Sequence, residues 1–322
     1  MFPVPSGKLV LAAVVGLGVA SLAVAQPPLP PVAAPSPPPG ALELNTLTAP
    51  PSPPPPAYTD PLLETAPEWR PFEFFPTSLL WEPKLADKRD PRLSVVFNNS
   101  DSYFSRETAD PSIGLTAGVV RFHPARFPGV TWQVDLFAVS HLRFSRFDES
   151  IAQDYRAGIP ITFRAGNVVG KIGYEHTSTQ IGDELVESGQ RTRRTFERDE
   201  IVGGLGYLWR EQLRVYGQTG VALSQNIPDT QDRWRHDVGF DWYKRQTTGV
   251  RGQPFAAVNA SFDPAVDYQV SMNYQVGWMW RVSDQRLSQF RVYAEFYDGY
   301  SPFGQLFDRR ERYAGFGIAL DY

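Results

Sequence analysis

The sequence of 322 residues contains no cysteine and carries little net charge. The missing cysteine excludes disulfides, thiolate metal sites and a cysteine nucleophile. The formal net charge of −4 shows no strong bias along the chain, which argues against a surface that binds nucleic acid. After residue 25 there is no apolar run of about 18 residues, so no transmembrane helix is predicted there. The mean hydropathy of −0.31 is also too low for a bundle of membrane helices.

Residues 1–25 have the pattern of a secretory signal peptide. Lys8 supplies a positive charge, the stretch "LVLAAVVGLGVASL" forms an apolar core, and "AVA" before Gln26 fits a cleavage site with small residues. An uncleaved anchor helix is the alternative, but the apolar core is shorter than the ~20 residues that such a helix needs. Residues 1–25 are therefore predicted to be removed from an exported protein.

The next two segments differ sharply in composition. Residues 26–58 hold fourteen of the thirty prolines. Because proline fixes φ and removes a backbone donor, we expect an extended linker here; a peptide ligand for a partner is the alternative. Residues 59–90 include "EWRPFEFFPTSLLWEPKLADKRD" and are aromatic and irregular. They are predicted to form a periplasmic arm that packs against, or plugs, the domain that follows.

From residue 91 onward, apolar and polar residues alternate in long runs. The clearest run is residues 268–280, "YQVSMNYQVGWMW", which places tyrosine, valine, methionine and tryptophan on one face and glutamine, serine and asparagine on the other. Strict alternation over this length predicts a β-strand. Similar runs predict about twelve strands, at residues 91–99, 112–122, 129–144, 155–166, 168–178, 198–209, 211–225, 234–246, 252–262, 267–281, 287–299 and 310–322.

Strand length and residue chemistry distinguish a membrane barrel from a soluble sandwich. Several predicted strands exceed ten residues, whereas strands of soluble sheets usually have about 5–6. Their polar faces carry charges and amides, and their apolar faces end in aromatic residues, as in barrels exposed to lipid. The predicted fold class is therefore all-β: a closed antiparallel transmembrane β-barrel of about twelve strands over residues 91–322. A soluble β-sandwich is the alternative.

The chain ends with "RYAGFGIALDY", which places Phe316, Ile318, Leu320 and Tyr322 on one face. This ending resembles the C-terminal assembly signal of bacterial outer-membrane barrels. The resemblance implies a bacterial outer-membrane location with the N-terminal tail in the periplasm. It also implies that the partners are membrane lipids, lipopolysaccharide and the outer-membrane assembly machinery. The stretches "EHTSTQIGDE" and "FFPTSLLWEPKLADKRDPRLS" also resemble an uncharacterised family of bacterial barrels of unknown function.

The stretch "VVGKIGYEHTSTQIGDE", residues 168–184, continues an apolar face into His176 and Ser178. A serine hydroxyl is a poor nucleophile unless a base takes its proton and a third group orients that base. Residues two apart on a strand share a face, so His176 can serve Ser178. On the next predicted strand the same parity directs Asp199 and Glu197 outward. Either carboxylate is a candidate orienting group.

The hairpin of residues 168–209 resembles the outer-membrane phospholipase A and lipid A deacylase families, which carry His-x-Ser on the outer face of a barrel. The resemblance implies a lipid acyl hydrolase with Ser178 as nucleophile and His176 as base. Ca²⁺ would be a cofactor of such a hydrolase, although no loop has ligand spacing for a metal. The motif of those families commonly continues with asparagine, whereas Thr179 follows here. The alternative is a polar cap at the membrane interface without chemistry.

Two sets of charges complete the candidates. Arginines in two predicted outward loops are candidates for binding the phosphates of lipid headgroups, and an ordinary solvated rim is the alternative. Charges predicted to face the lumen either line a pore or form a network that closes it, and the second is favoured for about twelve strands. The loop arginines are Arg191, Arg193, Arg194, Arg198, Arg309, Arg310 and Arg312, and the luminal charges are Asp135, Arg143, Arg291 and Glu295.

The sequence thus predicts an outer-membrane β-barrel protein with a structural or transport-related role. The alternative is the lipid acyl hydrolase. The sequence does not determine the oligomeric state.

Overall fold

The computed structural model describes residues 72–100, 106–145, 149–194, 196–227, 230–281 and 289–321. The predicted signal peptide, the proline-rich linker and the first part of the predicted arm lie outside these residues, as does Tyr322.

The described chain forms thirteen strands, one short helix and three 3-10 turns. The strands are β1 (Phe72–Phe74), β2 (Leu93–Ser100), β3 (Glu107–Phe122), β4 (Val130–Ser145), β5 (Glu149–Ala165), β6 (Val168–Ile181), β7 (Glu197–Trp209), β8 (Leu213–Asn226), β9 (Trp234–Trp242), β10 (Gln253–Phe262), β11 (Val270–Arg281), β12 (Gln289–Tyr300) and β13 (Arg310–Asp321). The helix is α1 (Asp183–Glu187), and the turns are η1 (Gly249–Arg251), η2 (Pro264–Val266) and η3 (Gly304–Leu306).

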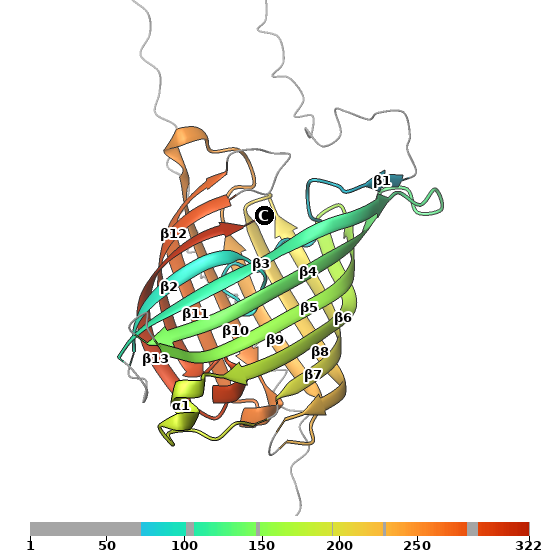
Figure 1. Cartoon of the computed structure of the whole chain (residues 1–322). Helices are drawn as coiled ribbons and strands as arrows, with labels where there is room; N and C mark the ends of the chain where they lie inside the picture. Colours follow the sequence, from blue (N-terminus) through green and yellow to red (C-terminus); the bar gives the residue numbers. More distant parts are fainter. Residues whose placement is uncertain are drawn as a thin grey trace, which may run out of the picture. The chain divides into compact units, whose positions relative to one another are not determined.

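Strands β2 to β13 close into an antiparallel barrel (Figure 1). Each strand pairs with the next along the chain, and β13 pairs with β2 to complete the ring. Strand β1 stands outside the ring and pairs with the end of β3. Closure leaves no long unpaired edge in the ring. The predicted closed, twelve-stranded antiparallel barrel is therefore confirmed.

Two strands begin at least five residues earlier than the sequence predicts. Strand β3 begins at Glu107 rather than at residue 112, and β5 begins at Glu149 rather than at residue 155. The added part of β3 contains acidic residues and Pro111, which disfavour a strand on local grounds. Pairing with both neighbouring strands keeps this part in the sheet, and Pro111 lies opposite Val95.

Different parts of the chain lie at the two ends of the barrel. The connections that carry α1, η2 and η3 gather at one end, called the α1 end below; β1 lies at the other, called the terminal end (Figure 1). Connections and strand ends pack at the α1 end as two buried hydrophobic clusters. The first contains Ile151, Ala152, Ile181, Leu185, Phe303 and Leu306, and the second contains Phe196, Ile227, Val266 and Phe307.

Residues 76–92, which connect β1 to β2, pass into the lumen and are called the lumen loop. Trp81 is 6% exposed and packs with residues of β6, β7 and β8. Lys84 is fully buried, and its ammonium group binds the carboxylates of Asp87 and Asp90 within the loop. The Arg92 guanidinium donates to carbonyl oxygens of the same loop, including that of Lys84 at 2.7 Å. The loop is thus folded by its own polar contacts.

The barrel wall binds the lumen loop by charge. Lys88 binds Glu295 of β12 at 2.6 Å, and Arg89 binds Asp237 of β9 at 2.6 Å. From β8, the Arg214 guanidinium donates to the carbonyl oxygen of Glu82 at 2.6 Å. These contacts reach the loop from several sides of the lumen. The cavity that remains between the loop and the α1 end has a volume of about 100 Å³.

The predicted luminal charges all lie inside the barrel. Arg143 pairs with Asp110 and Glu311, and Arg291 pairs with Asp321. Asp135 accepts a hydrogen bond from Thr162 at 2.9 Å, and Glu295 binds the lumen loop. All four side chains are buried, and each is bonded to another described residue.

Candidate functional site

His176 and Ser178 lie on the outward face of β6, close to the α1 end. In this part of β6 the odd-numbered side chains, including Glu175 and Thr177, are buried in the lumen. The even-numbered ones point outward, because successive side chains of a strand alternate between its faces. The predicted outward position of the His-x-Ser pair therefore agrees with the structure.

The register between β6 and β7 places a carboxylate beside the histidine. His176 lies opposite Asp199, and its Nδ1–H donates to Asp199 Oδ1 at 2.8 Å. The Tyr174 hydroxyl donates to the same oxygen at 2.5 Å. Two donors on one strand thus hold one carboxylate of the next.

The hydrogen bond to Asp199 assigns the tautomer of His176. A donating Nδ1–H leaves the lone pair on Nε2, which can accept a proton from a hydroxyl group. The side chain of His176 is 45% exposed and that of Asp199 is 32% exposed, so an outside molecule can reach the pair.

Ser178 follows two residues later on the same face of β6. Within the described part of the chain, its hydroxyl makes no hydrogen bond, including none to His176. Serine–base hydrogen bonds are often loose before a substrate binds. The arrangement supplies a free hydroxyl, an oriented imidazole and a carboxylate.

Of the two predicted carboxylates, Asp199 makes the contact with His176. Glu197 lies opposite Ser178 in the register and makes no hydrogen bond to His176. The sequence leaves this choice open because both residues share the outward parity, whereas the pairing of the two strands decides it.

Sequence reasoning missed Tyr174 as a partner of Asp199. It also missed Tyr155 of β5, which lies opposite Ser178 and is 41% exposed. The signal was available for Tyr174, which has the same parity as His176 on the same strand. Together these side chains form the outer polar patch, which comprises Gln153, Tyr155, Tyr174, His176, Ser178, Gln180, Glu197 and Asp199.

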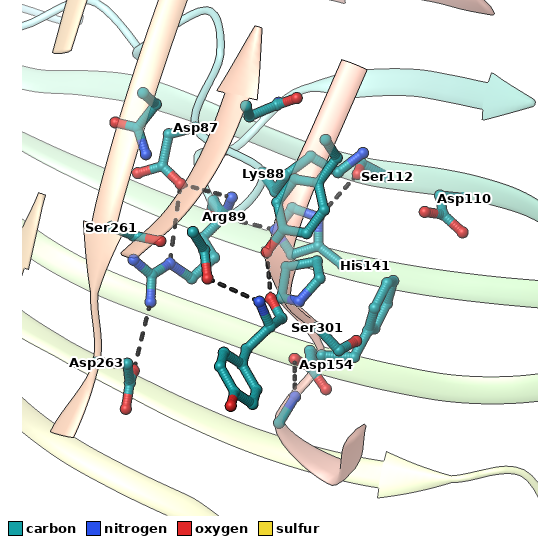
Figure 2. Close-up of a pocket in the computed structure, with 18 of the residues that line it drawn as sticks. Asp87, Lys88, Arg89, Asp110, Ser112, His141, Asp154, Ser261, Asp263 and Ser301 are labelled. Atoms are coloured by element: carbon teal, nitrogen blue, oxygen red, sulfur yellow. Dashed lines mark hydrogen bonds and ion pairs between the residues drawn. The ribbon is translucent and has the colours of Figure 1, made fainter. Parts of the chain in front are cut away.

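Two other histidines show what distinguishes His176. His236 also points outward, but its hydrogen-bond partner is the Thr219 hydroxyl at 2.8 Å. His141 lies in the lumen cavity, where it is bonded to Ser112 at 2.8 Å (Figure 2). Its Nε2–H donates to the carbonyl oxygen of Arg89, so Nδ1 accepts from Ser112 and both ring nitrogens are occupied.

The candidate headgroup arginines require a correction. Arg198 is 3% exposed and points into the lumen, where it binds Glu200, because it has the inward parity of β7. Arg191 is 7% exposed and is held by Asp308, so it is not available to a headgroup. Burial would raise the pKa of Asp308, but the hydrogen bond and the charge of Arg191 lower it below its ordinary value.

The other loop arginines lie at the α1 end and take part in ion pairs or backbone contacts. Arg193 binds Asp183, and Arg194 lies 3.6 Å from Asp308. Arg310 and Arg312 both bind Asp298 of β12. The amide of Arg309 donates to the carbonyl of Leu306 at 2.9 Å. Headgroup binding by these residues stays a prediction.

Three residues of the predicted assembly signal, Phe316, Ile318 and Leu320, lie on the outward face of β13, and Tyr322 lies outside the described residues. Phe316 is 50% exposed, and Ile318 and Leu320 follow on the same face.

Among the described residues, no group of three or more histidine and carboxylate side chains is placed to hold a metal ion. None of the helices in the described ranges is both long and apolar enough to cross a membrane.

A family model described as a protein of unknown function, DUF1207, matches residues 52–322. A search of curated proteins found no match.

The solved structures similar to this chain are bacterial barrels. The outer membrane phospholipase (OMPLA) of Salmonella typhi, a dimer with bound calcium, is 12% identical with a TM-score of 0.49, over 72% of this chain and 92% of that one. Outer membrane phospholipase A from Escherichia coli is 10% identical with a TM-score of 0.47, over 72% and 94%. The KdgM porin is 10% identical with a TM-score of 0.40, over 71% and 98%. Likeness at this level carries no argument about chemistry.

Proposed function

This chain belongs to the DUF1207 family of unknown function, and from its own geometry we propose that it is an outer-membrane barrel that hydrolyses lipid acyl esters on its outer wall. Ser178 is the nucleophile, His176 is the base and Asp199 orients the base. The single observation that carries the proposal is the hydrogen bond between His176 and Asp199, on the outward face beside Ser178.

The outward apolar side chains support a membrane location. Ile113 is 58% exposed, Leu205 is 62% exposed and Val276 is 58% exposed. Aromatic side chains flank this band towards each end, as in barrels that span a lipid bilayer. Towards the α1 end these are Tyr155, Tyr174, Trp234, Tyr274 and Phe296, and towards the terminal end Tyr207, Trp209, Trp242, Trp278 and Phe290.

The outer polar patch lies where the α1 end of this band meets the interface. Charged groups on the lipid face are costly at mid-bilayer but cost only about 0–1 kcal/mol near the interface, so the pair is tolerated there. The ester bonds of membrane lipids lie at the boundary between headgroups and chains. A hydroxyl, imidazole and carboxylate at this level therefore face the bonds they are equipped to cleave.

The reaction follows from the roles of these groups. The Ser178 oxygen bonds to the ester carbonyl carbon while His176 takes the hydroxyl proton at Nε2. The carbon–oxygen bond to the alcohol breaks, and His176 gives the proton to the departing lysolipid. Water then attacks the acyl-serine, and its proton passes through His176 to the Ser178 oxygen as the fatty acid leaves. Asp199 stabilises the imidazolium in both steps.

A structural role is the second candidate, and the filled lumen favours it. Buried ion pairs join the lumen loop to several strands, which would stiffen the barrel whether or not it is catalytic. Because these contacts fill the lumen, we propose no open channel. The lumen loop is proposed to act as a plug.

The full chain is therefore expected to show no steady conductance in a planar lipid bilayer. Replacing residues 77–91 by a flexible glycine–serine linker should produce stepwise conductance, because a twelve-stranded barrel is wider than the eight-stranded barrels whose side chains alone fill the interior. The same replacement in the turn of residues 123–129, at the terminal end, is the control and should stay silent. Steady conductance by the unchanged protein would contradict the plug.

Fatty acid release from glycerophospholipid by the refolded full chain tests the proposed function. Replacing Ser178 by alanine should lower the rate by roughly 10³-fold or more, because the nucleophile is lost. Ser224 is a matched control, since it is an outward serine opposite Asp199 on β8. Ser224→Ala should keep full activity. An inert wild type, or an active Ser178→Ala variant, would reject the hydrolase and leave the structural role as the remaining candidate.

A further inference from the structure

A groove crosses the outward face of β3, β4, β5 and β6 and has a volume of about 610 Å³. Its lining includes the small outward side chains of Ala138, Ser140 and Ala157. The larger side chains Ile113 and Leu115 of β3 stand at one end and are 58% and 55% exposed. This volume lies within the ~300–1,000 Å³ of ordinary ligand sites.

The other end of the groove is His176 itself. The strand register explains this, because one row of paired residues runs from Leu115 through Ala138 and Ala157 to His176. The adjacent row runs from Ile113 through Ser140 and Tyr155 to Ser178. The groove therefore ends at His176, the proposed base, and its lining residue Tyr155 lies opposite Ser178, the proposed nucleophile.

The groove descends from the interface into the apolar band. His176 lies five residues from Ile181, the α1 end of β6, whereas Leu115 lies eight residues from Glu107, the α1 end of β3. Strands of a barrel are tilted, so a path across them also moves along the barrel axis. In Figure 1 the path from β6 to β3 leads away from the α1 end. A chain that lies in it has its polar end at the patch and its apolar end within the bilayer.

We propose that this groove binds one acyl chain of a glycerophospholipid and holds its ester carbonyl at Ser178. The inference rests on the proposed function and adds the substrate class and a determinant of chain length. An acyl chain fits because the floor between the two ends carries the small side chains of Ala138, Ser140 and Ala157. The polar groups at its outward positions there are the hydroxyls of Ser140 and Tyr155, and neither is charged.

The charges at the α1 end favour a phospholipid over lipid A. Lipid A carries phosphate groups that call for several free cations. Beside β6 and β7, Arg191 and Arg194 share Asp308, and Arg193 binds Asp183. This rim is thus close to charge balance and suits a headgroup of low net charge.

Chain length provides the first test, with the refolded full chain in mixed micelles. Ala138 lies two strand spacings, about 10 Å, from His176, which exceeds the reach of a hexanoyl chain but not of a palmitoyl chain. Ala138→Phe should therefore lower palmitoyl hydrolysis about tenfold and leave hexanoyl hydrolysis within about twofold of wild type. Ala294→Phe is the matched control, because Ala294 points outward on β12, and it should change neither rate. If Ala138→Phe lowers the palmitoyl and hexanoyl rates equally, or lowers neither, the groove does not bind the acyl chain.

Crosslinking separates this inference from the proposed function. The Ser178→Ala variant prevents turnover and is embedded in vesicles that contain a phosphatidylcholine with a diazirine on one acyl chain. Adducts should concentrate on residues 113–115, 138–140 and 155–157. Two results would exclude a phospholipid acyl chain as the occupant of the groove. One is labelling that is spread evenly around the outward apolar residues, and the other is labelling obtained only from a diazirine-bearing lipid A. Concentrated labelling with an inert wild type would support the groove and reject the hydrolase.

Discussion

Replacing Asp199 by asparagine should lower the kcat of phospholipid hydrolysis by roughly 10²–10⁴-fold without unfolding the barrel. Asparagine is almost the same size, but it carries no charge to stabilise the imidazolium that forms when His176 takes the proton. Asparagine can donate as well as accept a hydrogen bond, so His176 can carry its proton on Nε2 instead of Nδ1. In the molecules with that tautomer, Nε2 has no lone pair to take the serine proton. The Tyr174 hydroxyl can still donate to the asparagine oxygen, which keeps the local packing.

The measurement is fatty acid release at saturating substrate, with the folded fraction checked by electrophoretic mobility before and after heating. Asp298 supplies the control, since it is a carboxylate near the α1 end of β12 that pairs with Arg310 and Arg312. Asp298→Asn should leave kcat unchanged. Full activity of Asp199→Asn would reject Asp199 as the orienting group and return Glu197 as the candidate.

Replacing Arg214 by methionine should destabilise the barrel by about 3–5 kcal/mol, which is the usual effect of breaking a buried ion pair. Arg214 is 1% exposed and joins the wall to the lumen loop. Its guanidinium binds Asp241 and donates to the carbonyl oxygens of Glu82 and Pro83 at 2.6 and 2.9 Å. Methionine has a similar shape but leaves one buried carboxylate and two carbonyls without these donors.

The free energy of unfolding is measured from urea titrations of the protein in vesicles. Arg312→Met is the matched control, because Arg312 pairs with Asp298 on the exposed outer face and its side chain is 63% exposed. Exposed pairs contribute about 0–1 kcal/mol, so this variant should change little. Equal effects of the two substitutions would show that the lumen network does not stabilise the fold.

Glu82 gives the same region a dependence on pH. Burial acts to raise its pKa, but the charges of Arg245, Arg281 and Arg214 and a hydrogen bond from Tyr243 lower it from 4.5 to about 2. A carboxylate whose pKa is lower in the folded state stabilises that state when ionised. The stability that Glu82 contributes is therefore present above pH 4.5 and is lost as the pH falls towards 2. Arg214→Met should weaken this dependence.

Much of the barrel could be predicted because alternation along a strand is a local property. The run of residues 268–280 shows its two faces in the sequence alone, and the same parity directs His176 and Ser178 outward and Arg143 inward. The early start of β3 at Glu107 could not be predicted in this way. Its acidic residues and proline are kept in the strand by their neighbours and not by their own preference.

By itself, the sequence determined the fold class, the approximate number of strands and the two faces of the strands with long alternating runs. These properties depend on residues one or two positions apart, and covalent geometry alone relates such residues. Only the tertiary structure decided that Asp199 and not Glu197 contacts His176, that residues 76–92 occupy the lumen, and that a groove of small side chains ends at the site. These depend on the stagger between strands and on packing across the barrel, where residues far apart in the chain set each other's positions.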